Sequence, residues 1–155
     1  MKYNVLQSYE ANVATIENPY HFEQQHLFDM ALRINKKRRF LFVSKVLGKH
    51  LAVNPNVPIL TSHLLAYRFM EERFDTIDAF TQTIRTAIQM NENLEHVLQA
   101  SRTQRLTLPR PVTIIGFAET ATALGHSFFE KFVGDVKFVH TTREHLVNFA
   151  PVICF

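Results

Sequence analysis

The amino-acid sequence predicts an α/β domain with a mostly parallel sheet and helices on both of its faces. Two short apolar runs, Val112–Phe117 and Phe40–Val43, are rich in β-branched and aromatic residues, which is typical of strands buried on both faces. Stripes of apolar residues at helical spacing separate and follow these runs. The length of 155 residues fits a single domain, 1–155, with a sizeable core.

Composition narrows the class of protein. Cys154 is the only cysteine, so no disulfide can form within the chain, and no charged-then-apolar leader begins the sequence. Both features favour a reduced, cytoplasmic setting. No apolar run approaches the roughly 20 residues that span a bilayer, so no membrane partner is expected. The net charge of +3 suits a phosphorylated ligand but is low for a dedicated nucleic-acid-binding protein.

The first third of the chain predicts short strands and then a helix. Imperfect alternation over Tyr3–Ile16 indicates two short strands. Asn18 followed by Pro19 is a good helix start, after which Leu27, Ala31 and Ile34 share one helical face. The basic run Lys36–Arg39 is then expected to cap the helix carbonyls. The alternative interpretation of this run is a contact with RNA, although the exposed aromatic residues that such modules use are missing.

The middle of the chain predicts further helices. Thr61 or Ser62 can cap a helix that turns Leu64, Leu65 and Phe69 inward. Another apolar stripe begins near Asp75–Thr76 and is interrupted at Asn91–Asn93 before it resumes. Ser101–Arg110 is interpreted as a polar linker, and Val136–His140 alternates as a further strand.

The stretch after Val112–Phe117 predicts a ligand site. A loop of small and hydroxyl-bearing residues, Ala118–Gly125, is expected to lead into a helix on which Phe128 and Phe132 lie. Ligands of parallel sheets bind beyond the carboxyl ends of strands, and amides at a helix start favour phosphate. Glu119 is the one carboxylate in this loop, and it would suit the two hydroxyls of a sugar diol.

A second loop follows the strand Phe40–Val43. Gly48–Lys49 invites comparison with a nucleoside-triphosphate P-loop, but the earlier glycine of that motif is missing and His50 occupies its Ser/Thr position. Lys45 and Lys49 still provide point charges of the kind that bind phosphate oxygens. The alternative is that both lysines are simply solvated.

No resident metal and no nucleophile are predicted. His140, Glu144 and His145 lie close in sequence, but they lack the helical or paired-cysteine spacing of a zinc site. Cys154 lies in an apolar run and has no partnered histidine, so it is interpreted as a small core residue.

Three segments together resemble a known family. These are RINKKRRFLFVSKVLGKHLAV, IIGFAETATALGHS and FVHTTRE, in this order along the chain. They resemble the type I phosphoribosyltransferase-like proteins of the group associated with tellurium-resistance gene clusters. The resemblance implies a glycosyltransferase of nucleotide metabolism with the type I fold. Such an enzyme binds phosphoribosyl pyrophosphate, carries in Mg²⁺ with the pyrophosphate, and transfers ribosyl phosphate to a nitrogenous acceptor.

The resemblance also implies which residues form the site, and places Thr141–Glu144 on the same sheet edge as Glu119. The wider superfamily has two adjacent acids at this strand end, whereas here Ala118 precedes a single Glu119. A non-catalytic regulator or interaction protein that keeps the phosphate site is therefore the rival interpretation. The implied pyrophosphate loop comprises Ser44, Lys45, Gly48 and Lys49, and the ribose 5-phosphate loop comprises Glu119, Thr120, Ala121, Thr122, Ala123, Leu124 and Gly125.

The chain stops on the apolar run Val152–Phe155. An unpaired apolar edge invites association, so we expect an exposed or intermolecularly paired strand there, and a homodimer is one outcome of such pairing. Proteins of the resembled group continue further, and the sequence therefore predicts a C-terminally shortened form or a fragment.

Overall fold

The computed structural model describes residues 2–6, 9–35, 40–71 and 79–143. Five helices and eight strands occur in these residues. In chain order they are β1 (Lys2–Leu6), β2 (Tyr9–Asn12), α1 (Gln24–Leu27), β3 (Phe28–Leu32), β4 (Phe40–Ser44), α2 (Asn56–Glu71), α3 (Ala79–Met90), α4 (Leu94–Thr103), β5 (Leu106–Thr107), β6 (Val112–Gly116), α5 (Thr120–Phe129), β7 (Phe132–Val133) and β8 (Val136–His140).

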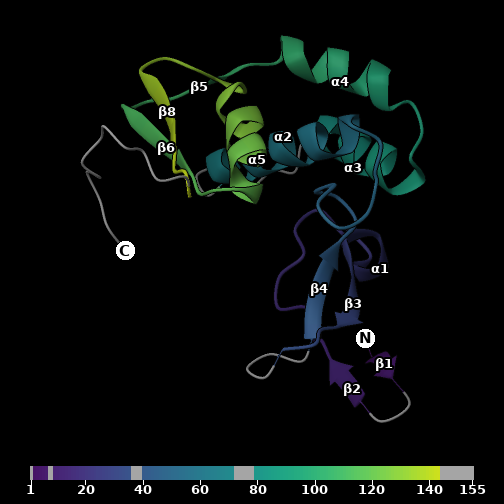
Figure 1. Cartoon of the computed structure of the whole chain (residues 1–155). Helices are drawn as coiled ribbons and strands as arrows, with labels where there is room; N and C mark the ends of the chain where they lie inside the picture. Colours follow the sequence, from purple (N-terminus) through teal and green to yellow (C-terminus); the bar gives the residue numbers. More distant parts are fainter. Residues whose placement is uncertain (1, 7–8, 36–39, 72–78, 144–155) are drawn as a thin grey trace.

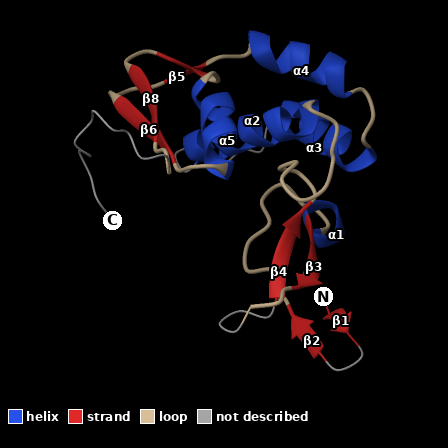
Figure 2. Ribbon diagram, in the orientation of Figure 1, coloured by secondary structure: helices blue, strands red, loops and turns tan. Residues whose placement is uncertain are grey.

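The elements form a helical body with a β-hairpin projecting from it (Figure 1). Helices α2 to α5 and the strands β5 to β8 make up the body, and β3 and β4 extend away from it towards β1 and β2. Each strand pairs with one partner (Figure 2): β1–β2 and β3–β4 are antiparallel, whereas β5–β7 and β6–β8 are parallel. Small parallel sheets with flanking helices fit the α/β class.

Two expectations about the sheet are wrong in the described residues. The predicted mostly parallel sheet is replaced by two-stranded pairs, because β4 pairs in antiparallel fashion with β3 rather than lying beside β6. The runs Val112–Phe117 and Phe40–Val43 are also not buried on both faces. Phe42 is 48% exposed and Ile115 is 49% exposed, and in β6 the exposed residues alternate with partly buried ones, as in a strand covered on one side.

The predicted helix from Asn18 to Ile34 is also wrong. The chain there forms the four-residue α1 and then β3, where Met30 lies opposite Phe42. Phe28 and Phe42 meet edge to face with ring centroids 5.1 Å apart, a cross-strand contact that helical spacing could not provide. Asn18 caps a turn instead of a helix, since its Oδ1 accepts the Phe22 N–H at 2.9 Å.

The later helices follow the predicted order with shifted boundaries. Helix α2 begins at Asn56, and the hydroxyls of Thr61 and Ser62 donate to carbonyls four residues back instead of capping the helix start. The break at Asn91–Asn93 between α3 and α4 is confirmed. The predicted linker Ser101–Arg110 contains the end of α4 and the strand β5, which pairs with β7. Two short strands near the N-terminus, β1 and β2, are confirmed.

Two buried clusters hold the body together. The larger lies between α2, α3 and α4 around Leu60, Ile84 and Leu98, which are almost fully buried. Val46, just after β4, packs in the same cluster and so ties the loop after the hairpin to the helices. The smaller cluster lies around Phe132 in β7, with Phe128 of α5 packed against it. The sequence placed Phe132 on the same helix as Phe128, but α5 ends at Phe129.

Several predictions fall outside the described residues. They concern the basic run Lys36–Arg39, the helix start at Asp75–Thr76, the metal candidates Glu144 and His145, and the terminal run Val152–Phe155 with Cys154. In the part of the chain that the structure does describe, no helix is long and apolar enough to cross a membrane.

Candidate functional site

The carboxyl ends of β6 and β8 meet at one edge. Their parallel register places Gly116 beside His140, and the Thr141 N–H donates to the Gly116 carbonyl at 3.0 Å. The Ala118 N–H in turn donates to Thr141 Oγ1 at 2.8 Å. The segment after β8 therefore lies on the same edge as Glu119, as expected. The hydrogen bonds of Thr141 fix the path of the chain between β6 and α5.

The predicted loop Ala118–Gly125 is mostly helix. Helix α5 begins at Thr120, so the residues from Ala121 to Gly125 are its first turns, and their amides do not converge on one point as predicted. Ala121 N–H donates to Phe117 O at 3.2 Å, and Thr122 N–H to Glu119 O at 3.3 Å. Ala and Leu in this segment favour helix strongly enough to outweigh the two threonines. These two hydrogen bonds occupy the amides of Ala121 and Thr122, so neither is open to an anion.

Two glycines set the position of α5 over the strand end. A Cβ on Gly116 would lie 2.9 Å from the Ala121 carbonyl oxygen, and a Cβ on Gly125 would lie 3.0 Å from the Phe138 ring. The same position on Gly125 is 3.5 Å from Gly116 Cα, so the helix and the strand approach backbone to backbone. This close packing determines where the start of α5 stands relative to β6.

A cavity of about 400 Å³ lies between the loop after β4, the first half of α2 and the first turns of α5. One face of α5 lines it, with Thr120, Ala123, Leu124 and Ser127 at the spacing of successive turns. Gly125 lies on the sheet side of the helix, and Ala121 and Thr122 are not among the lining residues. The remaining lining residues are Leu47, Gly48, Ala52, Val53, Pro55, Pro58, Ile59 and Ser62.

The two predicted loops meet at this cavity. Lys49 Nζ donates to Thr120 Oγ1 at 2.5 Å, across 71 positions of sequence. Gly48 lines the same cavity in the left-handed backbone region, with φ of +66°. Lys49 is exposed apart from this contact, so its charge is available at the mouth of the cavity.

The other two residues of the predicted pyrophosphate loop face the hairpin. Lys45 Nζ lies 3.0 Å from Asp29 Oδ2 and donates to the Gln25 carbonyl at 2.9 Å. Ser44 Oγ accepts the Val46 N–H at 3.2 Å. The structure therefore brings Gly48 and Lys49, but not the side-chain contacts of Ser44 and Lys45, to the start of α5.

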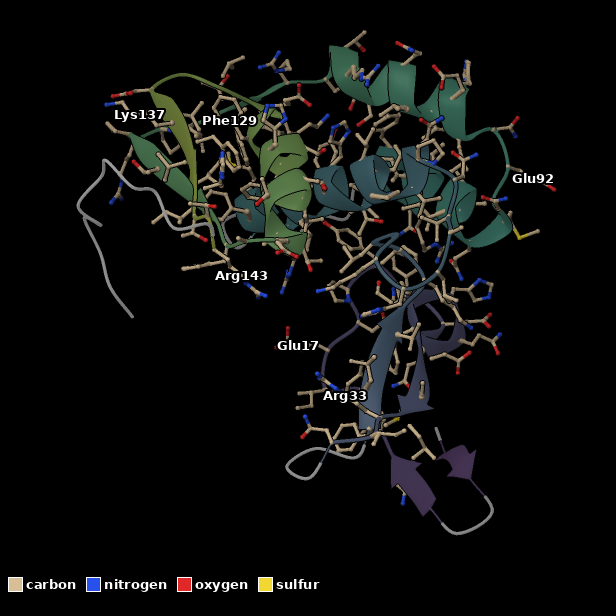
Figure 3. All side chains as sticks on the ribbon, in the orientation of Figure 1. Glu17, Arg33, Glu92, Phe129, Lys137 and Arg143 are labelled. Atoms are coloured by element: carbon tan, nitrogen blue, oxygen red, sulfur yellow. The ribbon has the colours of Figure 1, made fainter. Side chains whose placement is uncertain are left out.

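Glu119 precedes α5 and is exposed. Its side chain makes no capping hydrogen bond to the helix, and no ion pair of its carboxylate occurs among the described residues. Arg143, three residues after β8, extends from the same edge of the sheet (Figure 3). The sequence analysis placed the segment Thr141–Glu144 at this edge but assigned Arg143 no role of its own.

The described residues hold no group of three His, Cys, Asp or Glu side chains that could bind a metal ion. Glu119 is exposed and directly precedes Thr120, whose hydroxyl contacts Lys49. An ion that arrives on a substrate pyrophosphate and keeps most of its waters needs few protein ligands, so this arrangement is compatible with Mg²⁺.

Residues 27–155 match the family model described as phosphoribosyl transferase. The chain belongs to this phosphoribosyl transferase family. The match covers both segments that meet at the cavity, and it leaves β1 and β2 outside. No curated protein and no solved structure matches the chain significantly. The family membership supports a phosphoribosyltransferase-like function and a phosphoribosyl donor. Which residues bind the donor, and which molecule accepts the ribosyl phosphate, has to be argued from the site.

Proposed function

We propose that the protein binds phosphoribosyl pyrophosphate at the mouth of the 400 Å³ cavity and transfers its ribosyl phosphate to a nitrogenous acceptor. The observation that carries this proposal is the contact between Lys49 and Thr120. It joins a lysine-bearing loop to the start of a helix, so a cation and the positive end of the helix dipole face the same space. A donor with two separate phosphate groups needs both.

Each group at the cavity mouth has a role in this proposal. Lys49, with backbone of the Gly48 turn, binds the pyrophosphate. Thr120, at the positive end of the α5 dipole, binds the 5-phosphate, and Glu119 accepts hydrogen bonds from the ribose hydroxyls. Lys45 is already paired with Asp29, so it contributes long-range positive potential rather than a direct contact. In the same way, Thr122 and Gly125 support the helix rather than touch the ligand.

The proposed reaction exchanges one bond for another. The bond between ribose C1′ and the pyrophosphate oxygen breaks, a bond from C1′ to the acceptor nitrogen forms, and the acceptor proton leaves to solvent. Bound Mg²⁺ would neutralise charge on the departing pyrophosphate. Lys49 would hold that group in place, and Glu119 would orient the sugar as positive charge develops on it.

The lining of the cavity suggests the kind of acceptor. Leu47, Val53, Ile59 and Leu124 give it mainly apolar walls, while Thr120 and Ser127 add hydroxyls. Such walls suit the faces of a flat nitrogenous ring, and the hydroxyls suit its polar edge. We therefore propose a ring nitrogen as the acceptor atom.

A second candidate function is binding without transfer. The observation that favours it is the single carboxylate at the strand end, Glu119, next to Ala118. In this alternative the protein is a phosphoribosyl pyrophosphate-binding regulator or interaction protein of a stress-resistance cluster, as in the tellurium-associated group that it resembles. Both candidates use the same site, and they differ in whether pyrophosphate is released.

The test combines calorimetric titration of phosphoribosyl pyrophosphate and Mg²⁺ with an assay of pyrophosphate release in the presence of nitrogenous bases. We expect Lys49→Ala to weaken binding about ten- to a hundredfold, because a charge-assisted bond is lost. Lys137→Ala is the matched control, since Lys137 is an exposed lysine of β8 and does not line the cavity (Figure 3). Absence of binding by the unaltered protein contradicts both candidates, and binding without release with any base favours the second.

A further inference from the structure

A second cavity, of about 290 Å³, lies at the carboxyl ends of α4 and α5. It shares no lining residue with the cavity at the start of α5. Four of its five lining residues are basic, and they come from α2, from the end of α4 and from the segments that follow α4 and α5. The lining residues are His63, Arg102, Arg105, Glu130 and Lys131.

Lys131 is the buried cation of this cavity. Its residue surface is 1% exposed, and Nζ donates to Ser101 O at 2.5 Å, to Ser101 Oγ at 3.2 Å and to the Gln104 carbonyl. These three bonds use all three ammonium protons on neutral oxygens. No carboxylate pairs with Lys131 in the described residues. A buried charge without a counter-ion is costly, so an anion nearby would be stabilising.

Helix capping accounts for only part of this cluster. Ser101 and Gln104 lie at the end of α4, whose carbonyls carry about half a negative charge, and one lysine there is an ordinary capping device. Arg102 and Arg105 add two further exposed positive charges. Glu130 offsets one of them, although its carboxylate is turned towards His126, with 3.8 Å between Oε2 and Nδ1. The cavity retains an excess of positive charge.

His63 is the fourth basic residue, and it is neutral at pH 7. Burial, followed by the charges of Lys131 and Arg102, lowers the pKa of His63 to about 4. Its Nδ1 lies 2.7 Å from Ser101 Oγ. Ser101 is fully buried, so this serine–histidine pair is closed to a substrate carbonyl and cannot perform acyl transfer. The neutral His63 imidazole is therefore a polar lining group of the cavity.

We infer that this second cavity binds the phosphate group of a small phosphorylated molecule. Arg102, in the last turn of α4, and Arg105, just after it, would contact the phosphate oxygens. Arg105 Nη2 donates to the Phe132 carbonyl at 2.7 Å, so its remaining N–H groups would make that contact. Lys131, buried beneath the cavity surface, would supply a fixed positive charge and keep its three hydrogen bonds. The volume is at the lower end for ligand cavities, so it suits a phosphate with a small attached group rather than a dinucleotide. This inference does not depend on the proposed function.

The test uses the imidazole of His63 as a local reporter. Inorganic phosphate is titrated at constant ionic strength while the carbon-bound protons of histidine are followed by NMR, and His63→Gln identifies the relevant resonance. We expect this resonance to move saturably with phosphate and with ribose 5-phosphate. In Arg102→Ala/Arg105→Ala the dissociation constant should rise about tenfold or more. Lys49→Ala should leave the titration unchanged, because Lys49 lies at the other cavity.

Arg110→Ala is the matched control, since Arg110 is exposed and does not line the cavity. If the double variant does not fold, Arg102→Ala alone serves, because no hydrogen bond of the Arg102 side chain occurs in the described residues. The inference is overturned if the His63 resonance does not respond to phosphate, if Arg110→Ala weakens binding as much as the double variant, or if acetate shifts the resonance as strongly as phosphate.

Discussion

Lys49 Nζ and Thr120 Oγ1 lie 2.5 Å apart, although 71 positions of sequence separate the two residues. One residue belongs to the loop after an antiparallel hairpin, and the other begins the helix after a parallel strand. This single contact therefore connects the two halves of the candidate site. It also shows which lysine of the predicted pyrophosphate loop faces that site.

Thr120→Val should separate ligand binding from stability. Valine keeps the shape of the side chain but loses the hydroxyl, so we expect the free energy of unfolding to change by less than about 1 kcal/mol. Affinity for phosphoribosyl pyrophosphate should fall about tenfold with the loss of one phosphate contact. Thr122→Val is the control on the same helix, because Thr122 does not line the cavity. Equal effects of the two substitutions in calorimetric titration would contradict this assignment.

Glu119→Ala should leave folding nearly unchanged, because the carboxylate makes no capping bond to α5. If Glu119 accepts two hydrogen bonds from the ribose, at about 1.5–3 kcal/mol each, binding should weaken by about two to four orders of magnitude. Glu119→Gln should be intermediate, since its amide still offers one acceptor. Calorimetry and melting curves of each variant check this, with Glu92→Ala as the exposed control on the α3–α4 connection. Unchanged affinity in folded Glu119→Ala would remove the residue from the site.

Gly116→Ala should destabilise the protein by about 1–3 kcal/mol, because the new Cβ would press on the Ala121 carbonyl as well as on the Phe138 ring. Gly125→Ala should cost less. There the contact with Phe138 is opposed by the better helix propensity of alanine, worth up to about 1 kcal/mol. Urea unfolding of both variants measures the difference. A more stable Gly116→Ala protein would show that α5 is free to shift away from β6.

Acid should destabilise the protein through His63. Its pKa is about 4 in the folded chain and close to 6.5 in the unfolded chain, so between these values the unfolded chain binds more protons. The free energy of unfolding should therefore rise with pH from about 4 to 6.5, by up to about 3 kcal/mol from this residue. His63→Gln should flatten the rise, whereas His96→Gln, at an exposed position of α4, should not. Urea titrations across this pH range provide the measurement.

Local pattern predicted the edge of the candidate site well. Val112–Phe117 and Val136–His140 were both predicted to be strands, and parallel strands bring their carboxyl ends together, so Thr141 lies at the same edge as Glu119 and bonds to its neighbour Ala118. The helix boundary was missed because threonine lowers helix propensity while its alanine and leucine neighbours raise it. The outcome depends on packing of α5 against Gly116 and Phe138, which is a tertiary effect.

Other features had no local signal. Leu27, Ala31 and Ile34 fit a helical face, yet Phe28, Met30 and Leu32 alternate equally well, and pairing with β4 decided the outcome. The cluster of His63, Ser101 and Lys131 joins residues 38 and 30 positions apart. Each lies in a segment whose own pattern is that of an ordinary amphipathic helix or its end, so only the folded chain brings them together.

The close backbone approach of Gly125 to Gly116 holds one side of the candidate site more firmly than the other. The cavity wall formed by α5 is fixed in position, because α5 could move only if strand β6 and the Phe138 ring moved with it. On the opposite side, Gly48 lines the cavity and Lys49 contacts Thr120, and both residues are exposed. A ligand longer than the distance between Lys49 and the start of α5 would therefore fit only if the Lys49 side chain changed its conformation. The length of ligand that the site can bind is therefore set by the conformation of the Lys49 side chain and not by a rearrangement of the sheet.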